Sequence, residues 1–253
     1  MGYITRKRGV FYKDGRPVSE AEQIRCRKLG IPPAYKDVKV DPRPGAKLQA
    51  TAVDANGKKH YYYNESFLRK QRDKRRDRAN DIDFGKIRNV TARLLNQLKV
   101  SSLRWDDALA LRMIASAYLR SGVAERDTGA LGAFQLQRRH VKLKGDGETV
   151  VFDFPAKSGQ RRQFTVKDRV LHRALVQQNA PLLVGNAKWE RVRDLLRGIM
   201  KNDHLQLKDI RTAGSMQLFA KFLKSAKDEK EAIRQTAETI GHTPSVSKKF
   251  YIL

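Results

Sequence analysis

Cysteine is almost absent from this sequence, since Cys26 is the single one among 253 residues. One cysteine excludes an intramolecular disulfide and any cysteine-rich zinc or iron–sulfur site. No run of eighteen apolar residues occurs, so no transmembrane helix is expected. The first residues, MGYITRKRGVFYKDG, also lack the apolar stretch of a signal peptide. These absences predict an intracellular protein of the cytoplasm or nucleoid, or of the virion if the source is viral.

The motifs of nucleotide and metal chemistry are missing as well. Neither GxxxxGK[ST] nor GxGxxG is present, so nothing in the sequence predicts nucleotide binding or hydrolysis. The histidines show no HExxH-like spacing and no carboxylate pair beside them; they are His60, His140, His172, His204 and His242. We therefore expect no metal site and no cofactor.

Acidic residues are few relative to basic ones. The sequence contains 53 Lys and Arg residues and 27 Asp and Glu residues, which gives a formal net charge of +26. Residues 1–80 hold 21 basic and 9 acidic side chains, and residues 81–253 hold the other 32 and 18. Charge of this size favours a polyanionic partner. An anionic membrane would favour charge gathered on one amphipathic helix, so the even spread points to nucleic acid, with no membrane partner.

The first third of the chain has the pattern of short strands. Apolar and aromatic runs alternate with turn signals, and Asn56-Gly57 between ATAVDA and KKHYYY predicts a β-hairpin. The charged run FLRKQRDKRRDR at 67–78 is either a solvated helix or an interdomain linker that contacts phosphate. We place the domain boundary near Asn80, between a β-rich domain at 1–80 and a second domain at 81–253.

After residue 80 the apolar spacing becomes helical, as in IRNVTARLLNQLKV and LALRMIASAYL. The segment 147–166 alternates instead and predicts a β-hairpin with Lys157 at its tip. Helices are expected again from about Arg169, and Thr243-Pro244 is a typical helix start. The fold class is α+β, with a small β-rich N-terminal domain and a mostly helical second domain.

Five segments in order carry a family resemblance: LRSG (119–122), GAFQLQRRHV (132–141), FPAKSGQ (154–160), KDIRT (208–212) and GHTPSVSKKFY (241–251). They resemble the small type IB DNA topoisomerases of poxviruses and bacteria, and the stretch 31–63 is similar to the β-rich DNA-binding domain of that family. The last segment is the most specific of the five. The resemblance implies a helical catalytic domain like that of tyrosine recombinases and topoisomerases IB.

The same resemblance implies five catalytic residues at matching positions: Arg120, Lys157, Arg211, His242 and Tyr251. In this interpretation the tyrosine hydroxyl attacks a DNA phosphate and forms a 3′-phosphotyrosyl bond. The two arginines and the histidine bind the non-bridging oxygens, and the lysine protonates the departing 5′-oxygen. Resealing then needs neither ATP nor metal.

Each of these residues taken singly has an ordinary structural explanation, and only their order and spacing together favour catalysis. Arg112, on the same predicted helix as Arg120, is the competing candidate for the first arginine. In the N-terminal domain the resemblance implies a DNA-binding strand, with Tyr61 and Tyr63 on one face. Its expected contacts to duplex DNA are Lys58, Lys59, His60, Tyr61 and Tyr63.

Two other functions stay open from the sequence. A tyrosine recombinase would share the catalytic residue types, but it usually has His where this chain has Lys208, and it has a helical DNA-binding domain. A basic DNA-binding protein without activity would explain the charge alone. The sequence favours a monomeric type IB topoisomerase that clamps double-stranded DNA.

Overall fold

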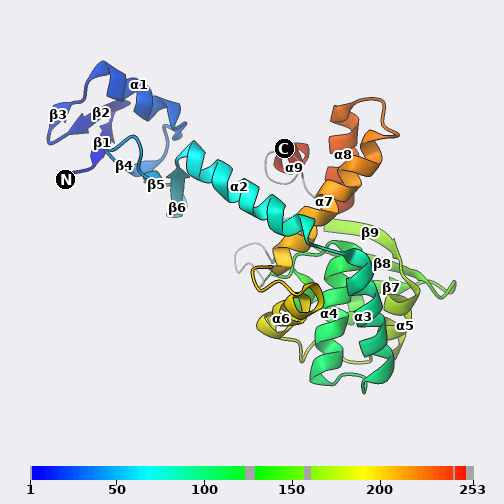
Figure 1. Ribbon diagram of the computed structural model, residues 1–253. Helices are drawn as coiled ribbons and strands as arrows, with labels where there is room; N and C mark the ends of the chain where they lie inside the picture. The colour runs from blue at the N-terminus through cyan, green and yellow to red at the C-terminus, as the bar shows by residue number, and fades with distance from the viewer. Residues whose placement is uncertain (1, 123–128, 157–160, 242, 249–253) are drawn as a thin grey trace. The chain divides into compact units, whose positions relative to one another are not determined.

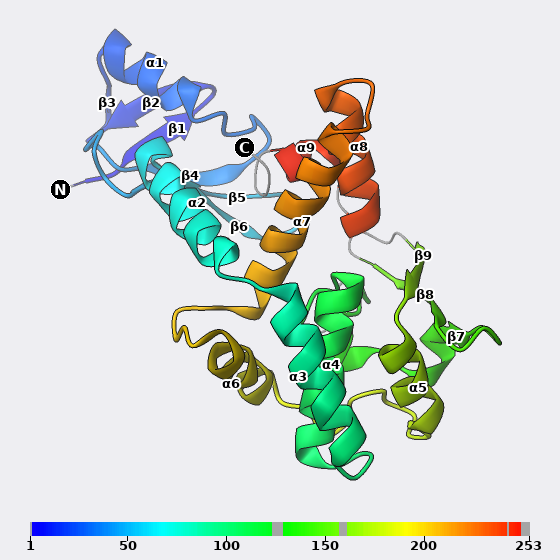
Figure 2. The same cartoon turned by 45° about the vertical axis from the view of Figure 1, so that its right-hand side comes forward.

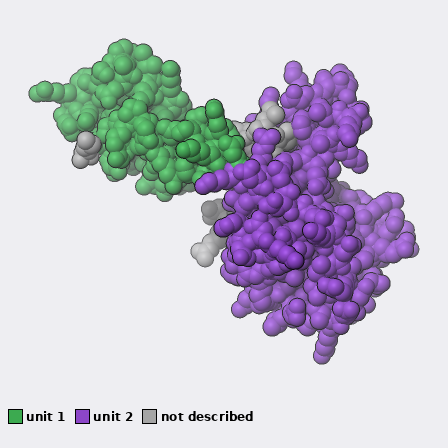
Figure 3. Space-filling view, in the orientation of Figure 1, with its two compact units in different colours: residues 1–73 green, residues 74–253 purple. Residues whose placement is uncertain are grey.

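The computed structural model describes residues 2–122, 129–156, 161–241 and 243–248. The chain divides into two units, residues 1–73 and 74–253 (Figures 1 and 3). The division falls inside helix α2 (Glu65–Asn80), whose last residue is the boundary expected from the sequence. The charged run at 67–78 is thus helical. Within the described ranges no helix is long and apolar enough to cross a membrane.

Unit 1 is built on a six-stranded antiparallel sheet with strand order β3-β2-β1-β4-β5-β6. The elements are β1 (Ile4–Lys7), β2 (Val10–Lys13), β3 (Arg16–Pro17), α1 (Glu20–Lys28), β4 (Lys36–Val40), β5 (Leu48–Val53) and β6 (Lys59–Tyr63). Strands β5 and β6 form the hairpin expected around Asn56-Gly57, and Gly57 has φ of +77°. This positive φ explains the glycine in the turn.

The core of unit 1 is small, with Ile4, Phe11, Val40 and Ala52 almost fully buried against Cys26 of α1. The sole cysteine is therefore a packing residue, and burial raises the pKa of its thiol. Arg6 adds polar contacts, because its guanidinium donates to four carbonyl groups of the loop at 31–35.

Unit 2 is mostly helical, and α4 lies at its centre. Its helices are α3 (Phe84–Gln97), α4 (Leu103–Ala117), α5 (Arg169–Gln177), α6 (Trp189–Met200), α7 (Leu207–Leu223), α8 (Glu229–Ile240) and α9 (Pro244–Ser247). Helix α4 contacts α3, α5, α6 and α7 (Figure 2). It is buried on nearly every side, because its apolar residues are distributed all round the helix axis and its buried charges, such as Asp107 and Arg112, have partners.

A three-stranded antiparallel sheet completes unit 2. Its strands are β7 (Val141–Leu143), β8 (Thr149–Pro155) and β9 (Arg161–Lys167), preceded by the short helices η1 (Ala133–Gln135) and η2 (Arg138–His140). Phe152 and Phe164 pair across β8 and β9, and their rings stack at 5.3 Å. The period-two alternation thus predicted this hairpin correctly, and the α+β fold class is confirmed.

The helix start expected at Thr243 is also present. Thr243 Oγ1 accepts a hydrogen bond from the backbone N–H of Val246 at 3.4 Å, and Pro244 occupies the first turn of α9. Proline fits there because that turn has no intrahelical partner for its N–H groups.

Candidate functional site

The segment that carries Arg120 begins where α4 ends. Tyr118 caps the helix in the left-handed conformation, with φ of 48° and ψ of 39°, and the chain leaves the helix axis there. Leu119 is 1% exposed and anchors the segment in the core, whereas Arg120 is exposed. The Arg120 carbonyl accepts a hydrogen bond from the Ala133 N–H at 2.7 Å. The exposed guanidinium therefore stands on a fixed backbone.

Gly132 brings a second segment close to that backbone. A Cβ at this position would lie 2.8 to 2.9 Å from the carbonyl oxygens of Arg120, Ser121 and Gly122. Contacts that short are not tolerated, so a glycine is needed here for the close approach. The GAFQLQRRHV segment therefore supports the LRSG segment directly.

Arg211 lies on α7 and is buried, at 4% exposure. Its Nη1 donates to the carbonyl of Tyr118, and its Nη2 donates to the carbonyl of Ile240 at 3.1 Å. One guanidinium thus joins the turn before Arg120 to the last residue of α8. Gly241, with φ of +78°, follows as the helix cap and precedes position 242.

Lys157, His242 and Tyr251 lie outside the described residues. The structure describes the elements on either side of two of them. Strands β8 and β9 precede and follow position 157 in the sequence, and α8 and α9 precede and follow position 242. Of the five residues expected at the site, the structure describes Arg120 and Arg211, and it bonds Arg211 to the backbone two residues before Arg120.

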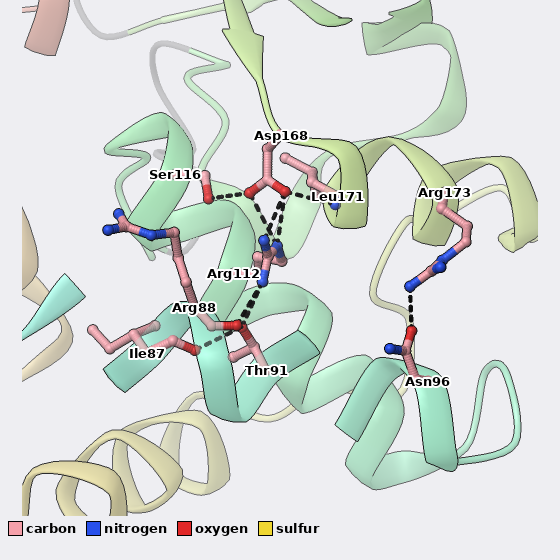
Figure 4. Close-up of polar contacts among 9 residues, drawn as sticks. All are labelled: Ile87, Arg88, Thr91, Asn96, Arg112, Ser116, Asp168, Leu171 and Arg173. Atoms are coloured by element: carbon pink, nitrogen blue, oxygen red, sulfur yellow. Dashed lines mark hydrogen bonds and ion pairs between the residues drawn. The ribbon is translucent and has the colours of Figure 1, made fainter. Parts of the chain in front are cut away.

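Arg112, the competing candidate, has a different environment (Figure 4). Its Nη2 lies 2.7 Å from Asp168 Oδ1, and both side chains are less than 8% exposed. Its Nη1 donates to the Arg88 carbonyl at 2.8 Å and to Thr91 Oγ1 at 3.1 Å. Ser116 Oγ also donates to Asp168, at 2.7 Å. Arg112 is therefore the centre of a buried structural network and is not presented to a ligand.

Burial alone would raise the pKa of Asp168, but its hydrogen bonds to Arg112, Ser116 and the Leu171 N–H outweigh that effect. The pKa is lowered overall, so the carboxylate is charged at neutral pH and balances Arg112.

Arg162 was not among the expected residues, and the structure places it beside them. Its Nη2 donates to the Thr239 carbonyl at 2.9 Å, and its guanidinium lies 4.2 Å over the Phe164 ring. Burial and the nearby charge of Arg120 lower the pKa of Arg162 to about 10, which leaves it charged at neutral pH. No motif signals this residue, because it follows Arg161 on the same strand and looks like a second solvated arginine.

Strand β6 of unit 1 separates the expected DNA contacts into two groups. Tyr61 and Tyr63 share one face and are 54% and 39% exposed. His60 lies on the opposite face, where its Nε2 is 2.7 Å from Asp54 Oδ2 and its ring is 4.7 Å from the Tyr35 ring. The alternation of a strand explains the difference.

The two lysines of this hairpin are exposed. Lys59 Nζ lies 5.6 Å from the centre of the Tyr61 ring, and the Lys58 N–H donates to Asp54 Oδ1 in the turn. In the described part of the chain no cluster of three or more His, Cys, Asp or Glu side chains could hold a metal ion.

Comparisons with known proteins identify the family. Residues 10–54 match the model of the bacterial DNA topoisomerase IB N-terminal domain. Residues 66–251 match the model of the eukaryotic DNA topoisomerase I catalytic core. The second match spans most of the sequence, so the chain belongs to the type IB DNA topoisomerases. Its activity is that of an isomerase that relaxes DNA, and its partner is duplex DNA.

Individual relatives are similar over nearly the whole chain. DNA topoisomerase 1B of Acanthamoeba polyphaga mimivirus is 28% identical over 280 residues, which cover 96% of this chain and 81% of the relative. DNA topoisomerase 1B of Vaccinia virus (strain Copenhagen) is 24% identical over 282 residues, covering 97% and 87%. Among solved structures, the XerH site-specific recombinase bound to difH substrate has a TM-score of 0.45 and 13% identity, covering 79% of this chain and 56% of XerH. That likeness is too low to carry an inference about activity.

Proposed function

We propose that this chain relaxes supercoiled duplex DNA through a covalent tyrosine intermediate at Tyr251, with Arg120, Lys157, Arg211 and His242 as the other catalytic residues. The observation that carries the proposal is the pair of hydrogen bonds from Arg211. They join the turn before Arg120 to the end of α8, one residue before Gly241 and two before His242. Segments from three distant parts of the sequence thus meet at one guanidinium.

The chemistry follows from the residue types. The Tyr251 hydroxyl attacks phosphorus, its proton passes to solvent, and the bond between phosphorus and the 5′-oxygen breaks. Arg120, Arg211 and His242 donate hydrogen bonds to the non-bridging oxygens, where negative charge grows in the transition state. Lys157 supplies the proton that the 5′-oxygen takes up.

The free 5′ end can then rotate about the intact strand before the reverse reaction reseals the break. Because the phosphotyrosyl bond keeps the energy of the phosphodiester, neither ATP nor a metal ion is required. We propose a monomer that clamps the duplex and acts wherever that duplex lies, in the cytoplasm or nucleoid, or in a virion. The proposed DNA contacts of the N-terminal unit are Lys58, Lys59, His60, Tyr61 and Tyr63, with His60 on the opposite face of β6 from the two tyrosines.

The test is relaxation of a supercoiled plasmid in EDTA and without ATP, followed on an agarose gel. The wild-type chain is compared with Tyr251→Phe, which removes the nucleophile. Tyr3→Phe serves as the matched control, since Tyr3 is an exposed tyrosine of unit 1, 57% accessible. We expect relaxation by the wild type and by Tyr3→Phe, and none by Tyr251→Phe with DNA binding retained.

Relaxation by Tyr251→Phe would remove Tyr251 from the mechanism. If a folded, DNA-binding wild type did not relax the plasmid, a denaturing gel for the covalent adduct would decide between the remaining functions. An adduct only on a specific site would indicate a recombinase, and no adduct would indicate a binding protein without activity.

A further inference from the structure

Tyr118 caps the end of α4, two residues before Arg120. Its backbone conformation is unfavourable for a residue with a side chain. Its φ of 48° and ψ of 39° lie in the left-handed region, where the Cβ atom crowds the carbonyl oxygen. Such residues persist when the surrounding structure holds them, and they gather at functional sites. The contacts of Tyr118 explain what holds it.

The Tyr118 ring occupies a notch on α7. A Cβ added to Gly214 would lie 2.5 Å from the ring carbon Cδ1 and 3.2 Å from Cζ, so the ring takes the space of the missing side chain. The ring also contacts Phe84, edge to face, with ring centres 5.9 Å apart. The half-buried ring therefore contacts both α3 and α7.

The Tyr118 backbone contacts the same helix, because its carbonyl accepts the hydrogen bond from Arg211 Nη1. Arg211 and Gly214 are three residues apart on α7 and therefore share one face of the helix. The Tyr118 carbonyl thus holds Arg211, the proposed catalytic arginine of α7. The Tyr118 ring and dihedral angles set the direction in which the backbone continues toward Arg120.

We propose that Tyr118 is a positioning residue for DNA cleavage, a wedge that sets Arg120 and Arg211 to converge on the scissile phosphate. This inference rests on the proposed function of the two arginines. Displacing catalytic groups by about 1 Å can slow a reaction roughly 100-fold. A loosened wedge therefore affects the chemical step much more than DNA binding, which depends on many phosphate contacts.

The test variant is Gly214→Ala, which places a methyl group in the ring's notch and leaves Tyr118 and both arginines in the sequence. Its matched control is Gly198→Ala on α6, another helical glycine, whose added Cβ meets no atom within 4 Å. The measurement is the single-turnover rate of covalent adduct formation on a duplex with an ordinary scissile phosphate, beside DNA affinity from gel shifts.

A second duplex carries a methylphosphonate at the scissile position. It lacks the negative charge that the arginines neutralise, so cleavage of this duplex depends less on their placement. We expect Gly214→Ala to slow cleavage of the ordinary duplex by about 100-fold, to slow the methylphosphonate duplex much less, and to keep the wild-type affinity. Gly198→Ala should cleave both as the wild type does. Equal slowing of both duplexes by Gly214→Ala would overturn the proposal, because it would show a general packing effect.

If Gly214→Ala does not fold, Tyr118→Gly decides instead, since glycine accepts the left-handed conformation and only the ring is lost. Tyr118→Gly should show the same selective slowing of the ordinary duplex. Tyr118→Phe keeps the ring and should therefore cleave that duplex at nearly the wild-type rate. Wild-type rates from Tyr118→Gly would refute the wedge. These results differ from failure of the proposed function, in which the wild-type chain itself would form no adduct at Tyr251.

Discussion

The buried pair of Arg112 and Asp168 should be the largest single electrostatic contribution to the stability of unit 2, and Asp168→Asn tests this. Asparagine keeps the side-chain shape and caps a helix as well as aspartate does, so the Leu171 N–H at the start of α5 keeps its acceptor. What the variant removes is the negative charge beside a guanidinium that is 5% exposed. Removing one partner of a buried ion pair costs about 3–5 kcal/mol, because the other charge is left uncompensated.

For a unit of this size each kcal/mol lowers the midpoint of thermal unfolding by roughly 2–4 °C, so we expect a fall of roughly 6–20 °C. Tryptophan fluorescence is the appropriate probe. The two tryptophans of the chain, Trp105 and Trp189, both belong to unit 2, so their signal follows that unit without interference from the other. This avoids treating a two-unit chain as one transition.

The matched control is Asp153→Asn, which breaks the pair with Arg161 across the β8–β9 hairpin. Arg161 is 77% exposed in that pair, and exposed pairs contribute little because water and salt screen them. The control should not shift the midpoint measurably. An equal effect of Asp168→Asn and Asp153→Asn would refute the reasoning from burial. Adding Arg112→Met to Asp168→Asn should destabilise little further, since the uncompensated charge is then gone.

The sign of the pH dependence follows from the lowered pKa of Asp168. A carboxyl group with a lower pKa in the folded state stabilises the fold above its unfolded pKa of about 3.9. That contribution is lost as the pH falls through the folded-state pKa. The difference in stability between wild type and Asp168→Asn should therefore be constant near neutrality and should narrow below about pH 4. A difference that stayed constant into strong acid would contradict the assignment of the charged form.

Three other outcomes are expected. Gly132→Ala forces the carbonyls of residues 120–122 away, and adduct formation measured on a denaturing gel should fall about 100-fold while gel shifts stay normal. Lys157→Ala should slow cleavage of an ordinary duplex but spare one with a bridging 5′-phosphorothiolate, whose leaving group needs no proton; equal slowing of both would exclude the general-acid role. Tyr61→Ala should weaken duplex binding about tenfold in a gel-shift titration, and an unchanged affinity would remove the exposed face of β6 from the DNA contact.

Periodicity was enough to predict much of the fold. The alternation around Phe152 and Phe164 specified a hairpin, and Asn56-Gly57 specified another, because a side-chain period and a turn residue are local properties. The charged run at 67–78 was ambiguous because it has neither an apolar period nor a turn residue. Its composition fits a solvated helix and a linker equally, and what distinguishes them is the backbone hydrogen bonding of α2.

The site was less predictable, because its contacts join residues far apart in sequence. The bond from Arg211 to the Ile240 carbonyl spans 29 residues, and the bond from Arg162 to the Thr239 carbonyl spans 77. Both acceptors are backbone carbonyls, which leave no trace in the amino-acid sequence. The resemblance names His60 with Tyr61 and Tyr63 as DNA contacts, and the strand alternation places His60 on the face opposite the two tyrosines.

The end of α4 explains why two arginines of one stretch have different environments. Arg112, Ser116 and Arg120 are spaced four residues apart, which is the spacing of one helix face. Arg112 and Ser116 indeed both bind Asp168. A helix that continued beyond Ala117 would carry Arg120 along the same buried line. The left-handed turn at Tyr118 prevents this, and Arg120 leaves the line and is exposed. The residue that ends the helix therefore keeps Arg120 off the buried line of Arg112 and Ser116 and leaves its guanidinium exposed.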